Sequence, residues 1–439
     1  MKYYSTNGKA PETSLSEAVI KGLAPDKGLY MPEEIRPIAP EFYNSFENLT
    51  LQQIAYEAAS KLFGDDIDAD SLSEIVNSTL QFDIPLKQVE PNIFALELFH
   101  GPTLAFKDVG ARFMARLLRY FLKQQGCDKV NVLVATSGDT GSAVANGFLG
   151  VEGIHVYVLY PKGKVSNIQE SQFTTLGQNI TAIQVDGVFD DCQALVKQAF
   201  MDNELNAHMK LTSANSINIA RFLPQSFYYF YAVAQLKKLT GKSADELRKQ
   251  VVFCVPSGNF GNITAGLFAW RMGLPVNHFI AANNANDVFY KYLQTGIYKA
   301  MPSIQTLANA MDVGAPSNFD RILKLYHNDW TAIKNEISGA TYTDEQIAHT
   351  MQQCYKATGY VLDPHGACGY QALKDLLPDG KTGIFLETAH PAKFKEKVDH
   401  ILGTDIAIPE RLRKFISGKK QSVAMSKNFA DFKQFLLQQ

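Results

Sequence analysis

The chain is predicted to be an α/β protein with two regions of parallel sheet and a mainly helical N-terminal domain. Short apolar runs rich in β-branched residues alternate with stretches of helical spacing, as in parallel sheets linked by crossover helices. The alternation stops and begins again beyond an aromatic-rich helical stretch, which indicates a second sheet. A length of 439 residues fits two or three domains of this kind.

The N-terminal domain is expected to cover residues 1–90, where helical spacing dominates and no catalytic pattern occurs. Apolar residues recur at that spacing over 51–62 and again over 72–80. We expect residues 91–215 to form a smaller α/β domain. Residues 216–439 are expected to form a larger one that ends in peripheral helices.

The strands of the smaller domain are predicted from its apolar, β-branched runs. An expected helix over 109–122 follows the first of them, and an amphipathic stripe over 188–200 follows the last. The expected strands are 93–99, 130–135, 154–160 and 180–185.

The larger domain is predicted to begin with the aromatic-rich helix over 222–239. Three apolar runs after it are typical of buried strands. They are 251–255, 278–282 and 383–386.

Composition excludes several classes of protein. The 42 basic and 44 acidic residues give a net charge of −2, which argues against a nucleic-acid partner. The N-terminus lacks an apolar signal core, and no run of about 18 apolar residues exists, so no membrane contact is expected. The nine histidines form no HExxH pattern, and we expect no metal site.

Cysteine usage indicates a reducing compartment. The five cysteines are an odd number without a CxxC pattern, which is typical of free thiols rather than of a disulfide framework. We therefore expect a cytoplasmic protein.

Lys107 lies between a proline-containing turn and the expected helix over 109–122. Cations are disfavoured at a helix N-terminus, and that position lowers the pKa of an amine. Such an amine is suited to act as a nucleophile toward an aldehyde. The alternative interpretation is a solvated lysine at a helix start.

Three strand-to-helix junctions carry small polar residues, and in parallel sheets such junctions converge on one edge. In 136–141, backbone N–H groups open a helix and suit a carboxylate or phosphate, although a capped tight turn is the alternative. In 256–262, two glycines and two asparagines predict a phosphate cradle that lacks a lysine. In 387–393, the Thr388 hydroxyl suits a ring nitrogen, with a helix cap as the alternative.

Nucleotide-binding motifs are absent from the sequence. Two Gly-Lys-Ser/Thr triplets lack the earlier glycine of a P-loop, because Leu236 and Asp375 stand at that position. No GxGxxG follows the first strand, so an NAD-type Rossmann protein is a poor interpretation.

A reactive lysine, a phosphate cradle, a carboxylate-binding loop and a hydroxyl for a ring nitrogen are together what pyridoxal 5'-phosphate (PLP) requires. In these motifs the chain resembles the threonine synthase family of fold type II, tryptophan-synthase-like PLP enzymes, over nearly its full length. That resemblance implies two open twisted sheet domains with helices on both faces. The matching segments are 100–113, 135–143, 215–221, 256–262, 316–321 and 387–393, with 4–6 and 28–32 near the start.

The resemblance also implies the residues that hold PLP. Lys107 would be catalytic, carrying the covalent link to PLP through its amine and then moving protons. Thr388 would face the pyridine nitrogen, and Asp139 would lie near the cofactor where many relatives of the wider fold carry Asn. The implied ligands of the cofactor phosphate are Gly258, Asn259, Phe260, Gly261 and Asn262.

The implied reaction converts O-phospho-L-homoserine and water to L-threonine and phosphate, the last step of threonine biosynthesis. The α-carboxylate of the substrate would be bound by Ser137, Thr140 and Gly141. Candidates for its phosphate are Lys164, Ser216, Asn218 and Arg221. A structural ion pair is the alternative role for Arg221, and a solvated loop position is the alternative for Lys164.

Other functions remain open on the sequence. One alternative is an elimination enzyme such as a threonine dehydratase or a phospho-amino-acid lyase, and a substrate-phosphate site, tested at Arg221, separates these. Another is a non-catalytic PLP-binding homologue, which would have no need of Lys107. Asn7 departs from the family pattern, in which an arginine is expected. We expect a monomer or a homodimer.

Overall fold

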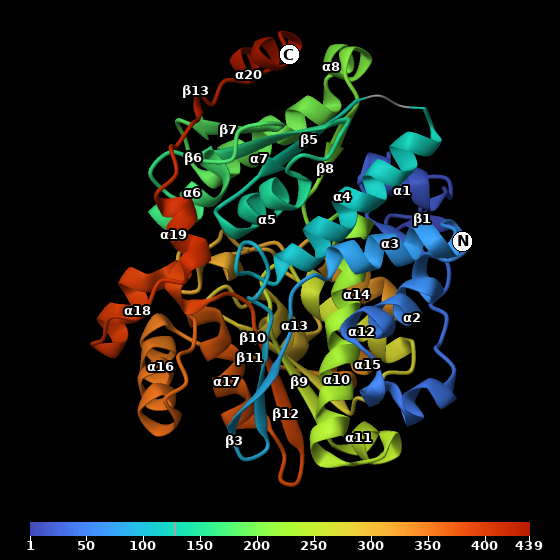
Figure 1. Cartoon of the computed structure of the whole chain (residues 1–439), viewed down its shortest axis with the longest axis vertical. Helices are drawn as coiled ribbons and strands as arrows, with labels where there is room; N and C mark the ends of the chain where they lie inside the picture. Colours follow the sequence, from blue (N-terminus) through green and yellow to red (C-terminus); the bar gives the residue numbers. More distant parts are fainter. Residues whose placement is uncertain (127–128) are drawn as a thin grey trace. The chain divides into compact units, whose positions relative to one another are not determined.

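The structure is a computed structural model that describes residues 1–126 and 129–439. The chain folds as an α/β protein (Figure 1). The chain divides into two compact units. Unit 1 contains Met1, 31–106 and 222–407, and unit 2 contains 2–30, 107–221 and 408–439. Within the described residues, no helix has the length and apolarity needed to cross a membrane.

This division differs from the three contiguous domains expected from the sequence, because the N-terminal region is shared between the units. Helix α1 (Leu15–Lys21) packs on elements of unit 2, and the same unit contains β1 (Tyr3–Ser5). Helix α2 (Leu51–Phe63) packs in unit 1 on α10 (Ser226–Thr240), next to α3 (Ala69–Thr79). The apolar stripe of α2 is therefore covered by a helix far along the chain.

Unit 1 is built on a six-stranded sheet in the order β11-β10-β9-β12-β4-β3, in which only the β3–β4 pair is antiparallel. Val252 of β9 pairs with His278 on one side and Gly383 on the other. Parallel pairing brings the carboxyl ends of β9, β10 and β12 to one edge. The strands are β3 (Leu86–Glu90), β4 (Ile93–Glu97), β9 (Val251–Pro256), β10 (His278–Asn283), β11 (Ile337–Thr341) and β12 (Thr382–Glu387).

Helices cover both faces of this sheet, as the alternation of side chains along β9 and β10 shows. Phe253 and Phe279 contact Tyr229 of α10 on one face. Cys254 and Ile280 point to the other face. There α17 (Pro364–Leu376) packs on β9, β10 and β12, with α16 (Asp344–Thr358) beside it.

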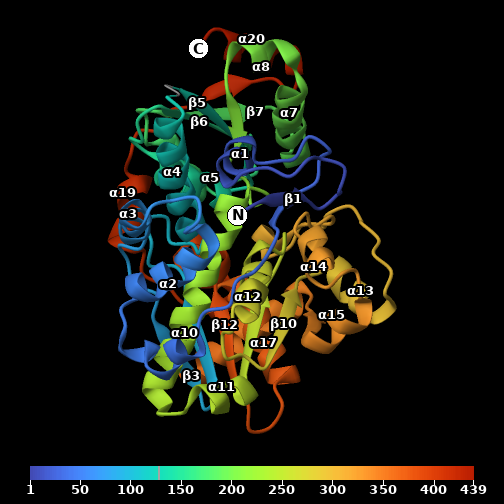
Figure 2. The ribbon, with the colours of Figure 1, turned by 90° about the vertical axis from the view of Figure 1, so that its right-hand side faces the viewer.

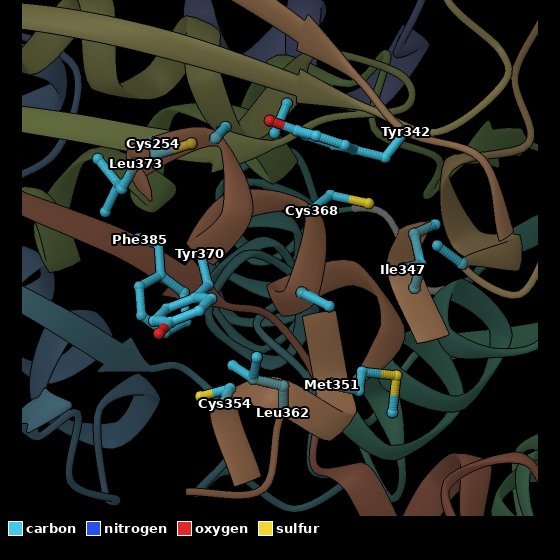
Figure 3. Packing of buried hydrophobic residues seen from close by; sticks show 14 of the residues in the cluster. Cys254, Tyr342, Ile347, Met351, Cys354, Leu362, Cys368, Tyr370, Leu373 and Phe385 are labelled. Atoms are coloured by element: carbon cyan, nitrogen blue, oxygen red, sulfur yellow. The ribbon is translucent and has the colours of Figure 1, made fainter. Parts of the chain in front are cut away.

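The core beneath α17 is shown in Figure 3, where Cys368 and Leu373 of the helix lie among side chains of the sheet and of α16. The remaining helices of unit 1 are α11 (Ala244–Gln250), α12 (Gly261–Arg271), α13 (Val288–Thr295), α14 (Phe319–Leu325), α15 (Trp330–Glu336) and α18 (Lys395–Leu402). Two elements contain the residues at which the chain passes from unit 2 to unit 1. They are β2 (Tyr30–Pro32) and α9 (Ile219–Phe222).

Unit 2 has a five-stranded parallel sheet in the order β13-β7-β6-β5-β8. Its helices form two groups, since α5 contacts both α4 and α6 while α7 contacts α8 and α20. Figure 2 shows α4 and α7 on opposite sides of the strands. The strands are β5 (Val130–Ala135), β6 (Ile154–Pro161), β7 (Ile180–Val185), β8 (Leu211–Ser213) and β13 (Val423–Met425). The helices are α4 (Lys107–Gln124), α5 (Asp139–Phe148), α6 (Asn167–Thr174), α7 (Phe189–Met201), α8 (Asn203–His208), α19 (Glu410–Ile416) and α20 (Phe429–Leu437).

Four of the five cysteines are free thiols in the described part of the chain, and all four are buried. They are Cys192, Cys254, Cys354 and Cys368, and Cys127 lies outside the described residues.

Candidate cofactor and substrate site

Lys107 is the first residue of α4 and also the first residue of its segment of unit 2. The residue before it, Phe106, belongs to unit 1 and donates its backbone N–H to the carbonyl of Thr388 at 2.9 Å. Within unit 2, Lys107 Nζ donates to Thr140 Oγ1 at 3.1 Å. The predicted nucleophile therefore lies against the predicted carboxylate-binding loop.

That loop, 136–141, is shaped by Thr136, whose hydroxyl accepts the N–H groups of Gly138 at 2.9 Å and Gly141 at 2.8 Å. A Cβ on Gly141 would lie 2.4 Å from Thr136 Cγ2, so this glycine is required by packing. The N–H groups of Ser137 and Thr140 donate to no protein acceptor in the described ranges. These two remain available for a carboxylate, whereas the Gly141 N–H is already used within the loop.

Asp139 is buried and accepts a hydrogen bond from Gln169 Nε2 at 2.9 Å. Gln169 comes from α6 and lies directly over Gly138, where a Cβ would approach its amide to 2.7 Å. Gly138 has a φ of 145°, a conformation that favours glycine. Gln169 therefore orients Asp139, and its role could not be predicted because no motif surrounds it in the sequence.

The candidates for the substrate phosphate have different environments. Lys164 is exposed after β6, and its ammonium makes no hydrogen bond with the described residues. Ser216 is half-buried. Asn218 is fully buried, and its amide donates to the carbonyls of Val19 at 2.9 Å and Ser213 at 3.2 Å. The buried side chain of Asn218 thus holds the backbone of unit 2 together.

Arg221 is also buried, with 2 % of the residue exposed. Its guanidinium donates to the Ala214 carbonyl, and its own carbonyl lies where a Cβ on Gly110 would stand. Burial lowers the pKa of Arg221 to about 10, and the charge of Asp108 opposes that shift. These surroundings favour support of the first turn of α4.

In unit 1, the loop 258–262 leads from β9 into α12 and presents a row of free donors. The backbone N–H groups of Gly258, Phe260, Gly261 and Asn262 donate to no acceptor in the described part of the protein. Phe260 has a φ of 62°, and no side chain caps the helix. Such a helix start is a site for an anion.

Two side chains fix the shape of this loop. Asn262 donates to the Pro256 carbonyl at 2.8 Å and accepts the Ser257 hydroxyl at 3.1 Å. Asn259 Oδ1 accepts the N–H of Ser317 at 2.6 Å, which joins the loop to the segment before α14. The loop is therefore held open around its free N–H groups.

Thr388 follows β12, and 6 % of the residue is exposed. Its hydroxyl makes no hydrogen bond with the residues that the model describes. Glu387, directly before it, is fully buried beside Asp363, and burial together with that carboxylate raises the pKa of Glu387 well above its usual range. The free N–H row and the free hydroxyl are the donor set that a phosphate and a pyridine nitrogen need, so unit 1 fits PLP.

Three family models match the chain. The model described as pyridoxal-phosphate dependent enzyme matches residues 78–386. The models described as threonine synthase N terminus and threonine synthase, C-terminal, match residues 2–80 and 366–436.

Curated relatives named threonine synthase are similar over the full length. The sequence from Haemophilus influenzae is 46% identical and covers 100% of both chains. The sequence from Escherichia coli is 45% identical and covers 94% of both.

Solved structures agree with the sequence comparison and confirm the expected fold. The crystal structure of threonine synthase from Escherichia coli has a TM-score of 0.91 at 43% identity and covers 100% of both chains. The PLP-bound threonine synthase from Brucella melitensis has a TM-score of 0.93 at 34% identity and covers 100% of this chain and 99% of that one.

Proposed function

The chain belongs to the threonine synthase family of PLP-dependent carbon–oxygen lyases, and we propose that its substrates are O-phospho-L-homoserine and water. The products are then L-threonine and phosphate. The observation that carries this proposal is the contact of Lys107 Nζ with Thr140 Oγ1 at 3.1 Å. It places an amine beside the loop that has free donors for an amino-acid carboxylate.

The cofactor ligands proposed in unit 1 are the loop 258–262 for the phosphate and Thr388 for the pyridine nitrogen. When bound, PLP supplies an electron sink for charge that develops on the substrate carbons. A neutral hydroxyl at the ring nitrogen makes that sink milder than a carboxylate partner would. Asp139, held by Gln169, is proposed as a further cofactor-binding residue in unit 2.

The substrate carboxylate is proposed to bind at Ser137 and Thr140, with Gly141 giving the loop its close packing. Lys164 and Ser216 are proposed as ligands of the substrate phosphate, because Lys164 has a free ammonium at a loop. The side chains of Arg221 and Asn218 are buried and bonded to the backbone of unit 2. They are therefore proposed to support the substrate-phosphate site rather than to contact the phosphate directly.

Lys107 is proposed to move protons at the substrate carbons. Its amine removes a proton from Cα and then one from Cβ, and phosphate leaves from Cγ. One proton returns to Cγ, which becomes the methyl group, and one returns to Cα as the hydroxyl of water adds at Cβ. One flexible amine suits several neighbouring atoms. The Thr140 hydroxyl accepts from this amine and so holds it at the carboxylate loop.

The test is an assay of purified protein with PLP and O-phospho-L-homoserine, in which phosphate and amino-acid product are both quantified. Threonine that appears one-for-one with phosphate supports the proposal. Phosphate with 2-oxobutyrate and no threonine would establish an elimination enzyme instead. L-Homoserine without phosphate is the control substrate.

A Lys107→Ala variant completes this test. It is expected to lose both products and the visible absorption band of PLP bonded to a lysine amine. Retention of that band would refute the assignment of Lys107.

We further propose a cytoplasmic monomer or homodimer, with the location supported by the four buried free thiols.

A further inference from the structure

His365 is a buried histidine in unit 1 that has no part in the chemistry above. It is the second residue of α17, and 2 % of it is exposed. Its Nε2 accepts the backbone N–H of Ala310 at 3.1 Å. Because Nε2 accepts, the ring proton is on Nδ1, which donates to Oδ1 of Asp363 at 2.5 Å.

The contact with Ala310 leads to the phosphate loop. Ala310 belongs to the 3₁₀ helix Asn309–Met311. A Cβ on Gly258 would lie 2.6 Å from Met311 Cα and 3.0 Å from the Ala310 carbonyl oxygen. Gly258 therefore rests directly on this short helix, and a shift of Ala310 would displace the start of the loop.

The contact with Asp363 leads to Thr388. The Asp363 backbone N–H donates to Glu387 Oε1 at 2.6 Å, and Asp363 Oδ2 accepts the N–H of Ala389 at 3.4 Å. Glu387 and Ala389 are the two neighbours of Thr388 in the chain. Asp363 thus binds the residues on both sides of the hydroxyl proposed for the ring nitrogen.

A simple helix cap does not explain this arrangement. Asp363 already caps α17 by accepting the backbone N–H of His365 at 2.7 Å. The imidazole adds a second bond to Asp363 and a separate bond to Ala310, and neither is needed to begin the helix. The ring is planar and rigid, so its two nitrogens fix the distance between the two partners.

We propose that His365 is a positioning residue that holds the phosphate loop 258–262 and Thr388 at the separation that PLP requires. This inference rests on the proposed function, because it takes those two segments as the ligands of the cofactor. His365 itself touches neither the phosphate nor the ring. It acts through Ala310 at one end and through Asp363 at the other.

Two substitutions separate the two ends. In His365→Gln the amide oxygen takes the place of Nε2 and keeps an acceptor for Ala310. In His365→Asn the amide nitrogen takes the place of Nδ1 and keeps a donor for Asp363. His365→Ala removes both. His278→Gln is the control, because it replaces a half-buried histidine on β10 of the same unit.

Apoprotein of each variant is titrated with PLP, and the bound cofactor is followed by phosphorus NMR and by its visible absorption band. The glutamine variant should keep the phosphorus signal and change the band, while the asparagine variant should do the reverse. Each is expected to weaken PLP binding about tenfold, and the alanine variant about a hundredfold. The control should match the wild type.

Unchanged affinity and unchanged signals in all three His365 variants would overturn the proposal. So would equal losses in all three that follow the melting temperature of the apoprotein, since core packing alone would then explain them. A wild-type protein that takes up no PLP would refute the proposed function, and with it this inference, and that result is distinct from either of the others.

Discussion

Arg221 and Asp108 are buried residues of opposite charge at the first turn of α4, the turn that begins with Lys107. We predict that Arg221→Met lowers the free energy of unfolding by about 3–5 kcal/mol, because it removes a buried positive charge that faces the Asp108 carboxylate. The measurement is the melting temperature of the apoprotein.

The double variant Asp108→Asn/Arg221→Met tests the cause of that loss. Removing both charges together should restore much of the stability. A single Arg221→Met variant with an unchanged melting temperature and a strongly raised KM would instead mark Arg221 as a direct ligand of the substrate phosphate.

His390 couples stability to pH. Burial, with smaller effects from His100 and Lys393, lowers its pKa to about 4, while its Nδ1 accepts the N–H of Ala392 at 3.1 Å. The unfolded chain takes up this proton near pH 6.5 and the folded chain only near pH 4. The contribution of neutral His390 is therefore complete above about pH 6.5 and is lost as the pH falls to about 4.

We predict that His390→Asn, which keeps an acceptor for Ala392, reduces the loss of stability between pH 7 and pH 5. The reduction should be about 1–2 kcal/mol in urea unfolding. The exposed His349→Asn is the control. Parallel stability curves for wild type and His390→Asn would contradict the assignment.

At the scale of the elements, helix α6 organises the start of α5. Gln169 donates to Asp139 and covers Gly138, so Gln169→Leu removes a hydrogen-bond donor from a buried carboxylate. We predict a rise of about tenfold in KM for the amino-acid substrate, with kcat less affected. Gln198→Leu, at an exposed position of α7, is the control. An unchanged KM in Gln169→Leu would show that Gln169 is only structural.

The strands β5 and β7 have the bounds predicted from the sequence, because both are short, largely buried runs in which β-branched residues recur. The strand β11 was missed. Its sequence, Ile-Ser-Gly-Ala-Thr, has a weak strand propensity. The strand is stabilised by its parallel pairing with β10, which the sequence does not reveal.

Some residues of the candidate site could likewise be predicted from the sequence, and others could not. Roles for Lys107 and the loop 258–262 could be predicted from local pattern, because the residues that form each pattern are adjacent in the sequence. Gln169 was not predicted, and His365 was expected only to shape a turn near the site, because each contacts residues brought near only by folding. Asn218 was predicted as a candidate ligand of the substrate phosphate from the family resemblance, whereas its burial and its hydrogen bond to Val19 of α1 could not be read from the sequence.

At the scale of the molecule, the order of the chain does not follow the order of the units. The N-terminal segment 2–30 and the C-terminal segment 408–439 both belong to unit 2, together with 107–221. The intervening segments 31–106 and 222–407 build unit 1. The C-terminal segment adds β13 to the edge of β7 and packs α20 on α7. Unit 2 is therefore incomplete until the end of the chain is in place.

Phe432 of α20 tests this dependence, because it is fully buried in the core of unit 2 with Ile183, Cys192 and Leu195. Phe432→Asp places a charge in that core and should destabilise it by about 3–5 kcal/mol. Hydrogen exchange should then quicken in β6 and β7 but not in β9, β10 and β12, because the two units have separate cores. Gln434→Asp, exposed on the same helix, adds the same charge without the burial and should leave exchange unchanged. Equal loss of protection in both sheets after Phe432→Asp would mean that the units unfold as one cooperative body.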